Sequence, residues 1–157
     1  MNSSVEAVLS EVKRVRPVDV AGAAQRLGVN VYSAKLAEKV SGVLLRDPSF
    51  KSESGFVIFV DEAEPAVRQR FTAAHELGHF VLHKEFIGDK IEDNYLLRSD
   101  GMSNRQEVEA NQFAANLLMP MDLVSQAMQE GITTPEELAK AFHVSKLAMS
   151  IRLGLVT

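Results

Sequence analysis

The stretch HELGHFVLH, residues 75 to 83, decides the fold of this chain because it places histidines one helical turn apart. His75 and His79 project from one face of a helix, so both imidazoles can reach a single metal ion. The His-Glu-x-x-His spacing is typical of metal-dependent peptidases, in which the glutamate takes a proton from water. The stretch therefore predicts His75 and His79 as metal ligands and Glu76 as the general base. The alternative is a buried helix that is rich in histidine by chance.

His83 is not a third ligand of the same ion. It lies eight positions after His75, which is about 12 Å along a helix axis. We expect it instead as a partly exposed or hydrogen-bonded histidine at the end of the helix, where the helix dipole favours a cation. The metzincin pattern also fails, because it needs glycine at 82 and histidine at 85, where this chain has Leu82 and Glu85. The third ligand must lie elsewhere.

The pattern of residues 103 to 118 selects one acidic side chain as the third ligand. The downstream candidates are Glu92, Asp93, Asp100, Glu107, Glu109 and Asp122. On a helical wheel Glu107 falls inside the apolar face, whereas Glu109 falls outside it, as a solvated carboxylate would. A glutamate on a face turned toward the core is unfavourable unless it is paired or bound to metal. Glu107 is therefore the predicted ligand, and Asn111, one turn later, is placed to orient a ligand histidine.

Composition limits both the metal and the compartment. The chain has 157 residues, a formal net charge of -4 and no cysteine, so a metal must be held by nitrogen and oxygen ligands. Zinc fits this set, as does another divalent ion such as Mn²⁺. Two histidines and a glutamate leave one position open, which is typical of a catalytic zinc site. The first twenty residues lack a signal core and no run of eighteen apolar residues occurs, so we expect a cytoplasmic protein with no membrane contact.

Periodicity and turn signals predict one α+β domain spanning residues 1 to 157, with a small antiparallel three-stranded sheet packed against a mostly helical, zincin-like core. The expected parts are N-terminal helices within 1 to 28, the sheet within 29 to 61, the two metal helices with their loop within 65 to 120, and a helix-turn-helix-like pair within 134 to 153.

Residues 87 to 103 are charged and poorly periodic, and are expected to form a mobile loop that could act as a lid. Tyr95 within it is a candidate for stabilising a developing oxyanion. The simpler interpretation is a surface tyrosine.

The C-terminal pair allows two interpretations. Basic residues could contact DNA phosphates. They are Lys140, Lys146 and Arg152. The simpler interpretation is a helical pair that covers the core, because six apolar residues in it are expected to be buried. They are Leu138, Phe142, Leu147, Met149, Ile151 and Leu153. With a net negative charge diluting any basic field, we do not expect DNA binding. His143 is expected in the turn.

RQRFTAAHELGHFVLH and the later EVEANQFAANLLMP together resemble the ImmA/IrrE family of metallopeptidases. The likeness extends to SGVLLRD, GFVIFVD and LAKAFHVSKLAMSIRL, roughly residues 17 to 153. It implies zinc ligands at His75, His79 and Glu107 and a general base at Glu76. It also implies cleavage of a helix-turn-helix repressor of the Xre type, or of an antitoxin partner, which would relieve repression under stress.

Two hypotheses from other classes remain beside the peptidase. One is a metal-stabilised partner-binding or antitoxin-like module that does not cleave. The other is a zinc-stabilised DNA-binding regulator, which would be retained on DNA in a strongly salt-dependent way.

Overall fold

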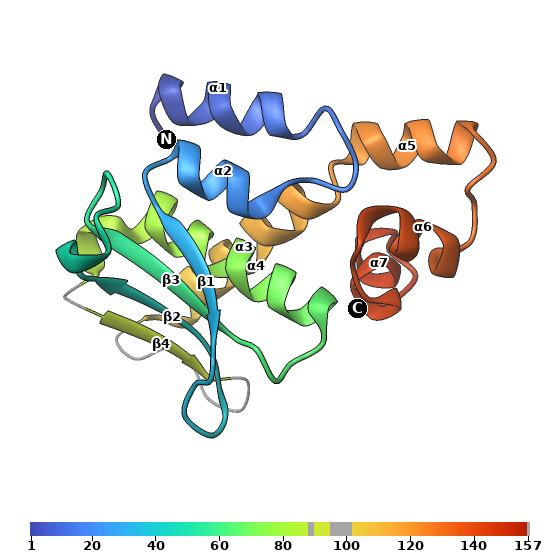
Figure 1. The fold of residues 1–157 in the computed structure, drawn as a ribbon. Helices are drawn as coiled ribbons and strands as arrows, with labels where there is room; N and C mark the ends of the chain where they lie inside the picture. Colours follow the sequence, from blue (N-terminus) through green and yellow to red (C-terminus); the bar gives the residue numbers. More distant parts are fainter. Residues whose placement is uncertain (88–89, 95–101, 157) are drawn as a thin grey trace.

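A mixed β-sheet lies against helix α3 (Ala66–His83), and a second long helix, α4 (Asn104–Leu118), packs beside α3 (Figure 1). The computed structural model describes residues 1–87, 90–94 and 102–156, with only the backbone of 90–94. The other helices are α1 (Ser3–Val12), α2 (Val20–Arg26), α5 (Met121–Gln129), α6 (Pro135–Phe142) and α7 (Lys146–Arg152), with short 3-10 turns η1 (Pro48–Phe50) and η2 (Lys84–Phe86).

The sheet has the order β1-β3-β2-β4, formed by β1 (Asn30–Ala34), β2 (Val40–Arg46), β3 (Phe56–Asp61) and β4 (Lys90–Asn94). The α+β class is confirmed, but the sheet is not wholly antiparallel. β2 and β3 form an antiparallel hairpin, and β1 takes the other edge of β3 in parallel register. β1 and β3 both run in the direction opposite to β2, so they are parallel to each other.

β4 corrects the prediction of a loop over residues 87 to 103 for residues 90 to 94, whereas residues 88–89 and 95–101 lie outside the described residues. The strand pairs antiparallel with β2, with an irregularity between Val40 and Gly42. The segment KIEDN is too charged to read as a strand. Its pairing is supplied by backbone groups at the open edge of β2, which side-chain pattern does not reveal.

Side-chain caps fix the starts of two helices. Ser103 and Gln106 form a capping box at the start of α4, with bonds of 3.0 and 3.2 Å. Asp19 caps α2 by accepting from the Gly22 amide. Such caps satisfy amides that have no partner inside the helix. The entry of α4 is therefore fixed by local chemistry one turn before Glu107.

Gly78 allows α3 and α4 to approach closely. A Cβ at this position would lie 3.0 Å from the Phe113 ring and 3.2 Å from the Ala110 carbonyl oxygen. No larger residue fits without moving α4. The glycine inside the HELGH motif thus sets the distance across which Glu107 can meet the two histidines.

The C-terminal pair forms as predicted, with His143 in the left-handed turn (φ 53°) between α6 and α7. α5 before it was not predicted. The expectation that all six apolar residues of the pair are buried holds for Leu138, Phe142 and Met149, whereas Leu153 is only partly buried against the core. It is wrong for the other two. Leu147 is 61% and Ile151 is 49% exposed, because α7 packs through Met149 and leaves the opposite side uncovered.

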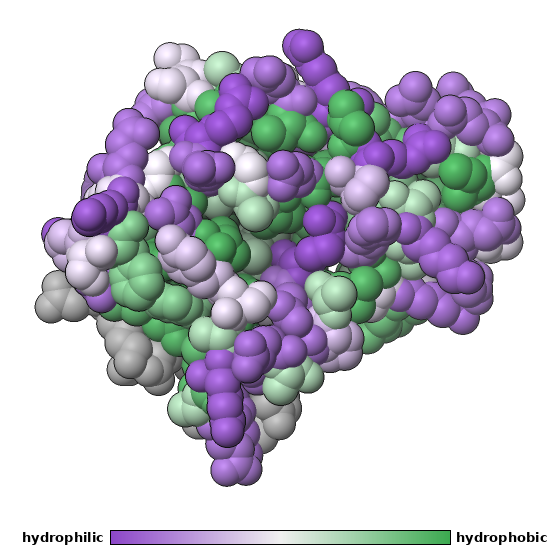
Figure 2. Space-filling model, in the orientation of Figure 1, coloured by the Kyte–Doolittle hydropathy of each residue, from purple (hydrophilic) through white to green (hydrophobic). Residues whose placement is uncertain are grey.

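Apolar side chains from α2, the sheet, α3, α4 and the C-terminal helices form one core cluster. Apolar residues also reach the surface among polar ones on the face seen in Figure 2. Among the helices the structure describes, none has the length and apolar character needed to cross a bilayer.

Candidate metal centre

α3 and α4 bring together His75, His79 and Glu107, with one potential ligand atom of each within 4.8 Å of the others. The two Nε2 atoms of the histidines are 3.1 Å apart. The carboxylate of Glu107 lies 2.8 Å from His79 Nε2 through one oxygen and 3.3 Å from His75 Nε2 through the other. Glu107, the residue selected on the helical wheel, thus lies beside both histidines.

This arrangement fits a divalent metal ion. Ligands placed tetrahedrally about 2.1 Å from zinc lie about 3.4 Å from one another, close to the separations found here. Two neutral imidazoles and one carboxylate are also a donor set that zinc and similar ions accept. All three side chains are at least partly buried, so solvent competes little for them.

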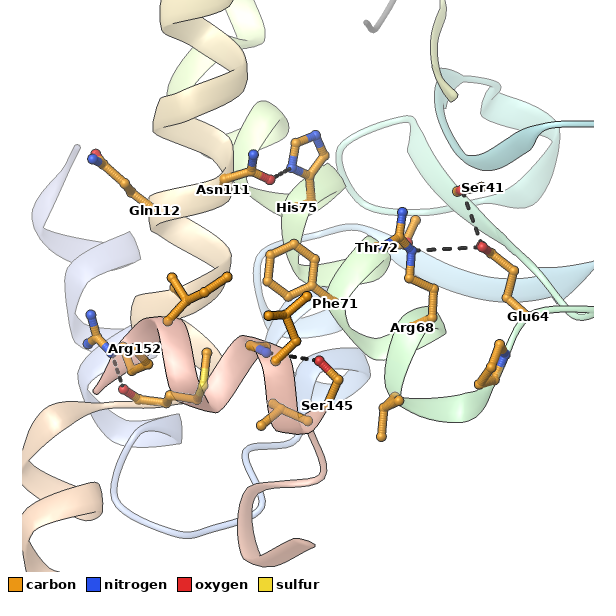
Figure 3. A pocket seen from close by; sticks show the side chains of 18 of the residues that line it. Ser41, Glu64, Arg68, Phe71, Thr72, His75, Asn111, Gln112, Ser145 and Arg152 are labelled. Atoms are coloured by element: carbon orange, nitrogen blue, oxygen red, sulfur yellow. Dashed lines mark hydrogen bonds and ion pairs between the residues drawn. The ribbon is translucent and has the colours of Figure 1, made fainter. Parts of the chain in front are cut away.

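Asn111 orients the ring of His75. Its side-chain oxygen lies 2.8 Å from His75 Nδ1 (Figure 3). Because an amide oxygen can only accept, His75 must carry its proton on Nδ1, which leaves the lone pair of Nε2 directed at Glu107 and His79. The contact predicted from the wheel is therefore present, and it selects the tautomer that a metal ligand needs.

His79 has a corresponding partner that the sequence did not indicate. Its Nδ1 lies 3.0 Å from Nδ1 of His83, and His83 Nε2 lies 3.2 Å from a carboxylate oxygen of Glu109. His83 is 3% exposed and Glu109 has a 41% exposed side chain. The expectation of a hydrogen-bonded His83 is confirmed, but it is buried rather than partly exposed. The i, i+4 spacing of the two histidines was the signal that could have revealed this contact.

Glu76 is fully buried, and neither carboxylate oxygen has a hydrogen-bond partner among the residues described. It lies where β2 meets α3. A Cβ added to Gly42 of β2 would be 3.4 Å from Glu76 and would collide with Thr72. A carboxylate removed from water without a partner is strongly disfavoured. Its place on α3, between His75 and His79 in the sequence, is the feature that calls for an explanation of this buried charge.

Burial lowers the pKa of His79, and the neighbouring imidazoles of His75 and His83 lower it further, against the opposing effect of Glu107. The neutral imidazole is the form that binds metal. The environment therefore holds His79 in its ligand form.

A cavity of about 1080 Å³ opens beside the centre and reaches from His75 and Glu107 to α7. Figure 3 shows its side chains rising from α3, α4 and α7, with Phe71 between the helices. Ser41 and Arg68 both approach Glu64 at the far side, at 3.5 and 3.8 Å. The cavity thus opens onto the cluster at His75 and Glu107.

The remaining predictions about the site have mixed outcomes. Tyr95 and Asp100 lie outside the described residues. The side chains of Glu92 and Asp93 in β4 are likewise not described. Asp122 is not part of the cluster.

A family model matches residues 24–154, which is most of the chain and includes every residue of the cluster. It is the Peptidase M78 family, described as the IrrE N-terminal-like domain. The chain belongs to this family. The IrrE N-terminal-like assignment agrees with the resemblance carried by the HELGH and EVEAN segments.

Two individual relatives are similar to this IrrE N-terminal-like chain. It is 31% identical over 116 residues to the radiation response metalloprotease IrrE of Deinococcus radiodurans, covering 71% of this chain and 34% of the relative. It is 27% identical over 158 residues to uncharacterized immunity region protein 2 of Bacillus phage phi105, covering 94% and 91%. The chain thus spans about a third of the Deinococcus protein.

A solved structure shares the fold. A transcriptional regulator of Mycobacterium tuberculosis superposes with a TM-score of 0.63 at 19% identity, over 96% of this chain and 45% of the regulator. At that identity the likeness concerns the fold alone.

Proposed function

We propose that this chain is a zinc-dependent endopeptidase that cleaves a helix-turn-helix repressor or antitoxin partner and so relieves repression. The observation that carries the proposal is Glu76, a fully buried carboxylate without a hydrogen bond in the described part of the chain, which follows His75 directly on α3 and precedes His79 by less than one turn. A site built only to bind a structural metal has no use for that carboxylate.

The residues divide the work. His75, His79 and Glu107 would hold zinc, which when bound polarises the scissile carbonyl and lowers the pKa of a water. Glu76 takes the proton from the attacking water and delivers it to the leaving amine. Asn111 and His83 hold the two ligand rings in the required tautomer.

The substrate class rests on the relatives. One is named as a metalloprotease of the radiation response and another belongs to a phage immunity region. Both names connect the family with a regulated response, which supports a regulatory protein as substrate. The net charge of -4 and the nitrogen and oxygen ligand set support zinc chemistry over DNA binding as the main activity.

The test is co-expression of the full chain with a helix-turn-helix repressor encoded beside it, followed by mass analysis of fragments. Glu76→Gln should keep the metal and lower the rate of cleavage by several orders of magnitude, because it removes only the base. Partner-dependent derepression that persists in Glu76→Gln would show a binding module instead of an enzyme.

The ligand set is tested separately by metal analysis of the purified chain. Glu107→Ala should lose most of its zinc, because two imidazoles alone hold the ion weakly. Asp122→Ala, a carboxylate outside the cluster, serves as the matched control. Equal zinc in the Glu107 variant and the wild type would contradict the assignment.

A further inference from the structure

We infer that α7 forms the wall of the substrate groove that selects large apolar side chains, so that the preferred substrate carries an apolar segment on one side of the scissile bond. This inference rests on the proposed peptidase function and adds the chemistry of the substrate. It begins from side chains that the fold leaves uncovered.

Leu147 and Ile151 lie one turn apart on α7 and are 61% and 49% exposed. Both line the cavity beside the metal centre. Val108 on α4 is 53% exposed and lines the same cavity. Large apolar side chains exposed together in one cavity are unfavourable unless a partner covers them, and a cluster of them marks a binding site.

The occupant is identified by the fact that the apolar side chains and the metal centre share one cavity. The same cavity is lined by His75 and Glu107 of the cluster and by Leu147 and Ile151 of α7. Phe71 also lines it and lies between His75 and α7 (Figure 3). A polypeptide whose peptide bond sits at the metal centre must pass this apolar surface in one direction. The volume of about 1080 Å³ exceeds that of most sites for small molecules, roughly 300 to 1,000 Å³.

The charged groups of α7 do not favour a nucleic acid in this space. Lys146 lies 2.7 Å from a carboxylate oxygen of Glu136, and Arg152 donates from Nε to the Met119 carbonyl at 2.9 Å. The cavity also contains the carboxylates of Glu64 and Glu107, which repel phosphates. An apolar peptide meets none of these penalties.

The side of the cavity away from α7, beyond His75, differs in chemistry (Figure 3). There Glu64 contacts Arg68 and Ser41, so polar side chains replace the apolar wall. A substrate would therefore meet apolar side chains on one side of the cut and polar ones on the other. Cleavage sites should show apolar enrichment on one side only.

The experiment uses a synthetic library of random decapeptides and the zinc-loaded full chain. Binding is read by immobilising Glu76→Gln and sequencing the retained peptides. Cleavage of the same library is read with an intact Glu76. We expect retained peptides enriched in Leu, Ile, Met and Phe, and an enrichment about tenfold lower after Leu147→Gln with Ile151→Gln in the same chain. Leu155→Gln, equally exposed but outside the cavity, is the matched control and should change nothing.

The outcomes separate the two proposals. Enrichment that depends on Leu147 and Ile151 without any cleavage would overturn the peptidase and keep the groove. Cleavage whose site profile is the same in the double variant would overturn the groove and keep the peptidase. Neither retention nor cleavage of any peptide would overturn both. Circular dichroism of each variant shows that it is folded, as expected for substitutions at exposed positions.

Discussion

Nδ1 of His79 lies 3.0 Å from Nδ1 of His83, one helical turn further along α3. This contact and that of His83 with Glu109 allow one consistent placement of the protons on the two rings. His79 donates from Nδ1 to His83, and His83 donates from Nε2 to Glu109, 3.2 Å away. The lone pair of His79 Nε2 then faces His75 and Glu107. His83 thus fixes the tautomer of His79, as Asn111 fixes that of His75. Each contact is made at Nδ1, which leaves Nε2 of each ring directed at the cluster.

Replacing His83 should therefore weaken metal binding without removing a ligand. We expect His83→Leu to reduce zinc affinity by about 10- to 100-fold, measured by competition with a chelating indicator. The ¹⁵N shifts of His79 should show a mixture of tautomers in the metal-free variant. His143→Asn, at an exposed left-handed position that asparagine tolerates, is the control. Equal affinity in wild type and His83→Leu would mean that the contact is only packing.

Asn111 provides a finer test because its side-chain oxygen is the atom that meets His75 Nδ1. Asn111→Asp keeps an acceptor for His75 Nδ1 and should hold zinc affinity within a few-fold of wild type. Asn111→Leu has no acceptor and should lose about tenfold or more. The same competition assay measures both. If the two variants behave alike, His75 is not oriented through this bond.

Gly78→Ala sets two effects against each other. Alanine improves helix propensity by about 1 kcal/mol, but its Cβ would press on the Phe113 ring and on the Ala110 carbonyl. Overpacking of this kind costs about 1 to 3 kcal/mol, and the carbonyl cannot rotate away. We expect a lower midpoint in thermal unfolding and weaker zinc binding as α4 moves. A higher midpoint with unchanged zinc would show that the helices have room to spare.

The metal-free chain should lose stability as the solution becomes acidic. Because the pKa of His79 is lowered on folding, the unfolded state binds more protons between the lowered value and the ordinary value of about 6.5. The free energy of unfolding therefore rises with pH through that window and levels off above it. Urea unfolding in EDTA between pH 5 and 8 measures this. His79→Gln should flatten the slope, and a fall in stability from pH 5 to 7 would contradict the assigned shift.

The residues of the cluster could be predicted from the sequence because their choice depends on positions within single helices. Helical rise separated His83 from the ligand positions, and helical phase separated Glu107 from Glu109. Both quantities depend only on residues within one helix. The meeting of α3 with α4 was inferred from the cost of a glutamate on an apolar face, and the structure places Glu107 beside both histidines.

The parts that were missed depend on contacts between distant segments. The parallel pairing of β1 follows from which edge of β3 remains open after the β2 hairpin. β4 forms in a charged segment because β2 offers backbone partners. Leu147 and Ile151 read as core residues, since hydrophobicity alone does not say whether another element will cover them. Glu109 read as a solvated carboxylate, although His83 reaches it from another helix.

The buried carboxylate of Glu76 has a consequence for how such a chain can change. A carboxylate that is buried and has no hydrogen bond in the described residues lowers the stability of the folded state. A lineage that kept the scaffold only for docking would gain stability from almost any apolar replacement there. Variation at position 76 therefore separates descendants that still perform chemistry from those that merely retain the shape.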